Sequence, residues 1–139
     1  MTPEINYLAI VVGTIIATVV AAIWYGPIFG KKWMEIVGAD PADIAARERM
    51  QKSAKPLYLI QILLTAFQVL ILAHLVADTT TVSGVTRAFW IWAGFVMPTI
   101  AATAMWNNDS ARISWARFLI QSGYQLIVFL IFGALLTFW

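Results

Sequence analysis

The polar side chains inside the apolar stretches of this sequence are glutamines and threonines, with hardly any acids, bases or nucleophiles. No Asp, Glu, Lys or Arg lies deep in any of four long apolar segments, and the chain has no cysteine. Intramembrane ionisable groups are the usual mark of proton relays and ion-coupled transport, so their absence argues against a proton-coupled antiporter. The lack of cysteine excludes disulfides, thiolate metal sites and a cysteine nucleophile.

The uncharged polar residues fall at similar depths in the four segments. Gln61, Thr65 and Gln68 share one helix face of the second segment. Gln121, Tyr124 and Gln125 share one face of the last segment. A proline in the third segment leaves the carbonyl four residues before it without a helical donor. The candidate residues for a polar core or ligand layer are Thr14, Gln61, Gln68, Pro98, Thr99, Gln121, Tyr124 and Gln125.

This layer has two interpretations. In the first, it supplies interhelical hydrogen bonds, which average about 0.6 kcal/mol in membranes and hold helices in register. In the second, it lines a small polar cavity for a substrate or a lipid head group. The first is favoured from sequence alone, because buried polar side chains need partners in any fold.

The sole histidine, His74, has Asp78 four residues later on the same helix face. Such a pair could respond to pH, but an interfacial histidine beside a solvated aspartate is the commoner arrangement. One His and one Asp make a poor metal site. With no carboxylate cluster in the apolar segments, we expect no catalytic residue, no metal and no cofactor, and hence no enzyme.

Composition places these residues in membrane helices. Hydrophobic residues make up 61% of the 139-residue chain and charged residues 12%, against about 45–50% and about 25% in soluble domains. A bilayer core about 30 Å thick needs roughly 20 apolar residues in a helix, and the segments lack the alternation of barrel strands. The sequence predicts an all-α integral membrane four-helix bundle, one domain over 1–139, with helices at about 5–25, 57–77, 88–106 and 115–139.

Positive charge predicts the orientation. Six Lys and Arg residues lie in the 26–56 connection and two near the third, whereas the second connection has one and the tails have none. The positive-inside rule therefore puts the first and third connections in the cytoplasm and both termini outside, in the inner membrane. No Lys or Arg precedes the first segment, so we expect it to be retained and not cleaved as a signal peptide.

The cytoplasmic loop 26–56 has its own helix signals. Gly26-Pro27 should stop the first helix, because proline has no N–H to continue the ladder. A short helix should begin at Pro41 with Asp40 as its N-cap, and Pro56 should open the second membrane helix.

Two features could bind partners. Lys31 and Lys32 beside the membrane could hold anionic lipid, although charges that set topology need no ligand. The first segment also carries a ridge of small residues, which would form either an internal packing seam or a homo-oligomer interface. The ridge consists of Ala9, Gly13, Ala17 and Ala21.

Three stretches resemble one family. Residues 24–33 read WYGPIFGKKW, residues 92–99 read WAGFVMPT, and Gly123-Tyr124 precedes the closing apolar run to Trp139. They are similar, in this order, to motifs of the family of membrane proteins catalogued as domain of unknown function 1761. The resemblance implies four membrane helices and no assigned activity. The first motif is interpreted as a helix stop with an interfacial aromatic anchor, formed by Trp24, Tyr25, Gly26, Pro27, Phe29, Gly30 and Trp33.

Two classes of function remain open. The small size, small-residue seam and uncharged core favour a structural, accessory or partner-binding membrane protein. The alternative is a small oligomeric transporter, pore or lipid-binding protein, which the polar layer and Pro98 would serve. A cavity reaching Gln68 and Gln125 would favour the alternative.

Overall fold

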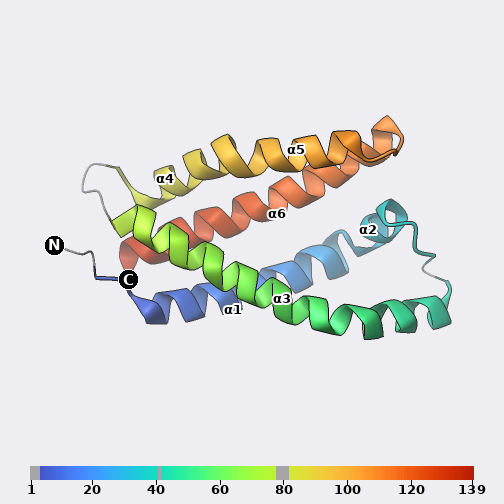
Figure 1. The fold of residues 1–139 in the computed structure, drawn as a ribbon, viewed down its shortest axis with the longest axis horizontal. Coiled ribbons are helices and arrows are strands. Elements are labelled where there is room, and N and C mark those ends of the chain that lie inside the picture. The colour runs from blue at the N-terminus through green and yellow to red at the C-terminus, as the bar shows by residue number, and fades with distance from the viewer. Residues whose placement is uncertain (1–3, 41, 78–81) are drawn as a thin grey trace.

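The computed structural model describes residues 4–40, 42–77 and 82–139, and the regular structure in these ranges is entirely helical. The chain folds into a bundle of long helices joined by short connections (Figure 1). Its elements are α1 (Tyr7–Ile23), the π-helical turn η1 (Trp24–Ile28), α2 (Gly30–Ile36), α3 (Ile44–Ala77), α4 (Gly84–Ile91), the π-helical turn η2 (Trp92–Val96), α5 (Met97–Trp106) and α6 (Ala111–Phe138).

Four continuous helical stretches are long and apolar enough to cross a membrane, which confirms the predicted all-α class. The stretches are Tyr7–Ile28, Ile44–Ala77, Gly84–Trp106 and Ala111–Phe138. The first, third and fourth stretches start within a few residues of the predicted positions, where polar side chains cap them. Asn6, Ser83 and Ser110 each accept a hydrogen bond from the backbone N–H three residues later.

The first connection is shorter than predicted, because the expected cytoplasmic helix and the second membrane helix form one helix of 34 residues, α3. Pro56 lies inside α3 and does not open a new helix. It sits where residues 51–53 are exposed, so a carbonyl that it frees is open to water. The N-cap also differs: Asp43 accepts from Ala46 N at 3.0 Å, whereas Asp40 accepts from Ala42 N. Pro41 lies outside the described residues.

The prediction that Gly26-Pro27 ends the first helix is wrong by a few residues. The helix widens into the π turn η1, in which Phe29 N donates to Trp24 O, five residues back, at 2.9 Å. The wider turn lets the chain pass the proline with few broken hydrogen bonds. Helix α2 then begins at Gly30, where a Cβ would lie 3.0 Å from the Tyr25 carbonyl oxygen. The same device recurs at η2, immediately before the helix that contains Pro98.

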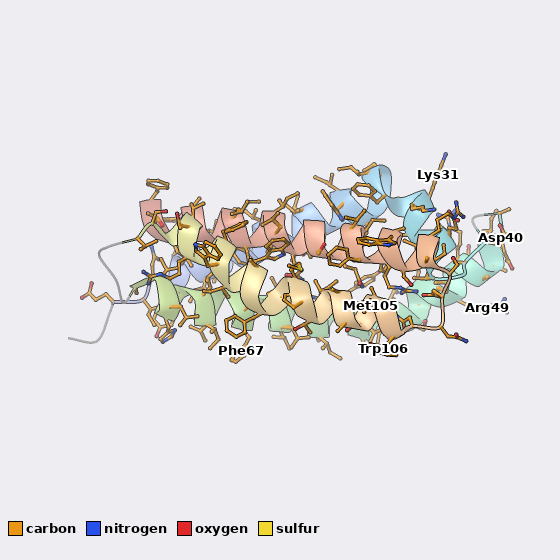
Figure 2. The ribbon with its side chains drawn as sticks, turned by 90° about the horizontal axis from the view of Figure 1, so that it is seen from above. Lys31, Asp40, Arg49, Phe67, Met105 and Trp106 are labelled. Carbon is orange, nitrogen blue, oxygen red and sulfur yellow. The ribbon has the colours of Figure 1, made fainter. Side chains whose placement is uncertain are left out.

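Helix α6 is the common partner in the bundle. It packs against α1, α2, α3, α4 and α5, and α1 also packs against α3. The core therefore lies along α6, where Phe132 and Val128 are fully buried against Val69 and Leu72 of α3. Most other large apolar side chains point outward; Figure 2 shows Phe67, Met105 and Trp106 on the outside of the bundle. An outward apolar surface is what a lipid-embedded bundle requires.

The small-residue ridge of α1 faces this core. Ala9 is 0% and Ala17 1% exposed. A Cβ on Gly13 would meet Val69 and Phe132 at 3.4 Å, an ordinary contact distance. The structure thus places the ridge in an internal seam, the first of its two predicted alternatives.

Helices α4 and α6 approach each other closely. A Cβ on Gly84 would lie 2.7 Å from the Gly133 carbonyl oxygen, and a Cβ on Gly133 would lie 2.6 Å from the Gly84 carbonyl oxygen. The Gly84 N–H also donates to Thr137 Oγ1 at 3.1 Å. Two glycines facing each other let the backbones touch, as small residues do in membrane helix pairs.

We expect Gly133→Ala to destabilise the bundle by about 1–3 kcal/mol, because the added methyl overpacks a backbone contact. The effect is measured as a lower midpoint of unfolding by SDS in mixed micelles. The matched control is Gly94→Ala, since nothing lies within 4 Å of a Cβ there. Equal midpoints for both variants would show that the α4–α6 crossing is loosely packed.

Candidate functional site

A cavity of about 850 Å³ lies between the four spans and is covered at one end by α2. It occupies the region where α3 and α5 diverge toward the end of the bundle that carries α2 (Figure 1). Its hydroxyl and amide lining consists of Thr18, Gln61, Thr65, Thr99, Thr103, Gln121 and Gln125, and its aromatic lining of Tyr25, Trp33, Tyr58 and Tyr124.

The cavity collects five of the eight residues of the predicted polar layer: Gln61, Thr99, Gln121, Tyr124 and Gln125. The other three do not line it. Thr14 is buried one turn away on α1, Gln68 is half-buried on α3, and Pro98 is exposed beside Thr99.

Several lining residues were not in the predicted layer. Thr103 lies four residues after Thr99, and this spacing on one helix face was the signal for it. Tyr25 and Trp33 were assigned to the membrane interface, and nothing in their spacing shows that α2 places Trp33 against the cavity.

The threonine hydroxyls of the cavity are bonded within their own helices. Thr18, Thr65, Thr99 and Thr103 each donate to the carbonyl four residues earlier, at 2.9, 2.8, 2.6 and 3.0 Å. This back-bonding occupies the single hydroxyl proton and leaves the oxygen lone pairs. These threonines therefore make intrahelical hydrogen bonds in place of the predicted interhelical ones. Their hydroxyl oxygens are left as acceptors in the cavity wall.

The glutamine amides complete the polar lining. Gln61 Nε2 donates to Thr65 Oγ1 at 3.3 Å. Gln125 Oε1 is buried and, among the described residues, has no hydrogen-bond partner. An unpaired buried acceptor costs about 1–3 kcal/mol, so the Gln125 carbonyl is an acceptor in need of a donor.

Around the cavity, tyrosine and tryptophan side chains donate hydrogen bonds from one helix to another. Tyr124 Oη donates to Ala17 O at 3.2 Å. Trp24 Nε1 donates to Ile120 O at 2.9 Å, and Trp92 Nε1 donates to the carbonyl of Ser122 at 3.1 Å. A helical carbonyl can accept these bonds because it has a second lone pair.

The two tryptophans connect the sequence motifs to α6. Trp24 is the first residue of η1 and Trp92 the first of η2, so the two π turns present their indoles to carbonyls two residues apart. Gly123 follows the second of these carbonyls, and a Cβ there would stand 3.2 Å from the Trp24 ring. The predicted interfacial anchor is thus, for Trp24, a clamp inside the bundle.

The aromatic residues close one side of the cavity. The Tyr25 ring lies 4.9 Å from the Trp33 ring and 5.5 Å from the Tyr124 ring, both centroid to centroid in edge-on geometry. Edge-on pairs of this kind are favourable beyond their burial. They hold Trp33 of α2 over the end of the cavity.

Ion pairs fasten α2 to α6. Glu35 accepts from Lys32 Nζ at 2.9 Å and is also paired with Arg112. The hydrogen bond from Lys32, with the charges of Lys32 and Arg112, holds the pKa of the Glu35 carboxyl below its ordinary value. Arg117 pairs with Asp109 at 2.8 Å and donates to the Ile36 carbonyl at 3.3 Å.

The predicted anionic-lipid residues and the histidine lie away from the cavity. Lys32 pairs with Glu35, while Lys31 is exposed and points away from the bundle (Figure 2). His74 Nδ1 lies 2.8 Å from Leu70 O, and Asp78 is outside the described residues. Within the described ranges, no three His, Cys, Asp or Glu residues are grouped to hold a metal.

The comparison with known protein families shows the family to which the chain belongs. Residues 8–137 match the model of the family described as Protein of unknown function (DUF1761). The chain belongs to this family. The resemblance inferred from the three motifs is confirmed, and two of those motifs contain the tryptophans that clamp α6. Among curated proteins and solved structures, none matches the chain significantly. The family description names no activity, so function must be argued from the site.

Replacing the Trp24 indole tests the clamp. We expect Trp24→Phe to lower the free energy of unfolding by about 1 kcal/mol or more, because it removes one N–H donor and part of a packed ring. The control is Trp90→Phe, at an outward-facing ring that is 66% exposed. Unfolding in SDS–detergent mixtures provides the comparison, and a Trp90→Phe loss as large as that of Trp24→Phe would contradict the clamp.

Acid should loosen α2. Because the folded-state pKa of Glu35 is lowered, its contribution is complete above the ordinary carboxyl pKa and is lost as pH falls through the lowered one. A nitroxide on Val37→Cys, in a chain without native cysteine, should become more mobile over that acidic range. Adding Glu35→Gln should give high mobility at neutral pH and flatten the transition. An unchanged pH profile in this double variant would exclude Glu35 as the fastening group.

Proposed function

We propose that this chain is a multi-pass inner-membrane protein that binds a small amphiphilic molecule between its helices, as a lipid-handling or transport protein. The observation that carries the proposal is the cavity of about 850 Å³ walled by all four spans. Ligand pockets are commonly about 300–1,000 Å³, mostly apolar with a few placed polar groups. This cavity has that size and that mixture of aromatic and amide side chains.

The cavity also bears on the two classes that the sequence left open. An accessory role was favoured by the small-residue ridge, but Ala9, Gly13 and Ala17 of the ridge are used inside the bundle. The polar layer was the argument for ligand binding, and Gln61, Gln121 and Gln125 do meet in one cavity. Ligand binding is therefore the better-supported class. A homo-oligomer is still proposed, without an assigned interface.

We propose binding and not catalysis. The lining contains amides, back-bonded threonine hydroxyls and aromatic rings, with no carboxylate, histidine, lysine or arginine. Such groups orient a ligand well, but they offer no general acid or base with a pKa near neutrality. The proposal therefore assigns no chemical step to the chain.

The proposed orientation has both termini outside and the cavity toward the cytoplasm. Helix α2, the start of α3 and the α5–α6 connection lie at one end of the bundle, and the start of α1 and the C-terminus lie at the other (Figure 1). The first end carries Lys31, Arg49 and Arg112, among others. Clustering of positive charge at one end supports the cytoplasmic assignment.

A single cysteine tests ligand binding. Ala22 lines the cavity, and the native chain contains no cysteine. In lipid nanodiscs, N-ethylmaleimide should modify Ala22→Cys at a measurable rate. A mixture of ten-carbon amphiphiles should slow the reaction several-fold, because an occupied cavity excludes the reagent. The mixture contains 1-decanol, methyl decyl ether, decanoate and decyltrimethylammonium.

The matched control is Ser53→Cys, on the exposed part of α3. Its reaction rate reports any effect of the amphiphiles on the reagent or the bilayer. Equal slowing of both cysteines, or of neither, would refute the proposed ligand site.

A further inference from the structure

We infer that the ligand of this cavity is an uncharged amphiphile whose head group donates hydrogen bonds, such as an alcohol or an N–H-bearing amide. The inference rests on the proposed function and adds the chemical class of the ligand. It comes from counting which hydrogen-bonding groups of the cavity wall are already used and which are left.

The hydroxyl protons of the cavity threonines are used. Thr18, Thr65, Thr99 and Thr103 all donate to carbonyls of their own helices, and Tyr124 Oη donates to α1. Five hydroxyl oxygens in the lining are therefore fixed as acceptors, since each hydroxyl has only one proton, and one of them, that of Thr65, already accepts from Gln61. At these positions a head group that only accepts hydrogen bonds would place lone pairs opposite lone pairs. Its bonds would have to come from the remaining donors of the lining, such as the Gln121 amide and the Trp33 indole.

Gln125 points to the same chemistry by an independent observation. Its side chain lines the cavity, while its Oε1 is covered and has no partner among the described residues. A buried amide oxygen without a donor is costly, so rotation of this amide toward a ligand hydroxyl or N–H would be favoured. Exchanging the amide O and N would place an unpartnered N–H₂ there, but the threonine acceptors would remain.

Charge is disfavoured because the lining carries none. Glu35 of α2 is already paired with Lys32 and Arg112, and Asp109 of the α5–α6 connection is paired with Arg117. A charged head group would lose its hydration without gaining a counter-ion. A quaternary ammonium could rest on the Tyr25 and Trp33 rings, yet it has no proton for the acceptors.

The aromatic rings and the opening between α3 and α5 suit the apolar tail of such a ligand. Tyr25, Trp33 and Tyr58 provide apolar faces beside the acceptors. Thr99, Thr103 and Gln61 are exposed at the surfaces of α5 and α3, so the polar wall meets the outside of the bundle at membrane depth. A molecule with an alkyl tail could present its head group there and leave the tail in lipid.

The test uses the four amphiphiles separately on Ala22→Cys in nanodiscs. We expect 1-decanol to protect the cysteine at the lowest concentration. Methyl decyl ether should protect at least several-fold less well, because it has nearly the same size and no donor. Decanoate and decyltrimethylammonium should protect least. Equal protection by the alcohol and the ether, or best protection by either ion, would overturn the donor inference and leave the ligand site standing. Protection by none of the four would overturn the proposed function itself.

Acceptor-removing variants give the second arm. Thr99→Val with Thr103→Val, and separately Gln125→Leu, should weaken protection by 1-decanol about two- to tenfold, as expected for one lost hydrogen bond. Protection by the ether should not change, which separates a lost acceptor from a damaged cavity. The matched control is Thr14→Val, because Thr14 back-bonds to Ile10 O in the same way but does not line the cavity. Unchanged alcohol protection in both cavity variants would overturn the inference.

Discussion

The structure depends on one constraint: a polar group inside a membrane must find its hydrogen-bond partner within the protein. The helices satisfy most of the backbone, and side-chain donors are directed back onto backbone carbonyls. Threonine hydroxyls bond within their own helices, while Trp24, Trp92 and Tyr124 bond across to neighbouring ones. Aromatic donors thus connect the helices around the cavity. Two of these donors, Trp24 and Trp92, begin the π turns that contain Pro27 or precede Pro98.

Helix α6 shows how this constraint shapes the bundle. At one end, Gly133 meets Gly84 and the backbones of α6 and α4 touch. Toward the other end, α6 carries Tyr124 and two glutamines, and bulky side chains from η1 and α2 pack against it. The glycine contact brings α4 and α6 together at one end of the bundle, and aromatic rings of η1 and α2 lie between the helices at the other end, where the cavity is.

Much of this arrangement could be predicted from the sequence, because the length of an apolar stretch and its helical periodicity can be read from neighbouring residues alone. They fix the four spans and the faces on which Gln61, Gln121 and Gln125 lie. They do not fix helix rotation or tilt, and so the depth argument grouped Gln68 and Thr14 with residues that line a cavity they do not reach. The turn from η1 into α2, which places Trp33 over the cavity, depends on contacts between distant segments. Pro56 was expected to start a helix because proline favours first turns. Instead it lies inside α3, where the carbonyl that it frees is exposed to water.

The polar layer was first interpreted as packing or as a ligand site, and the structure shows why these alternatives are linked. If the hydroxyls bonded across helices, they would fill the centre of the bundle, and each bond would use both a donor and an acceptor that face the cavity. Back-bonding through the i−4 carbonyl satisfies the proton locally and leaves the oxygen facing inward, so helix stability and an acceptor-lined cavity arise from the same hydrogen bonds. With the interhelical role transferred to Trp24, Trp92 and Tyr124, the threonines and Gln125 become available to something that enters from outside the fold.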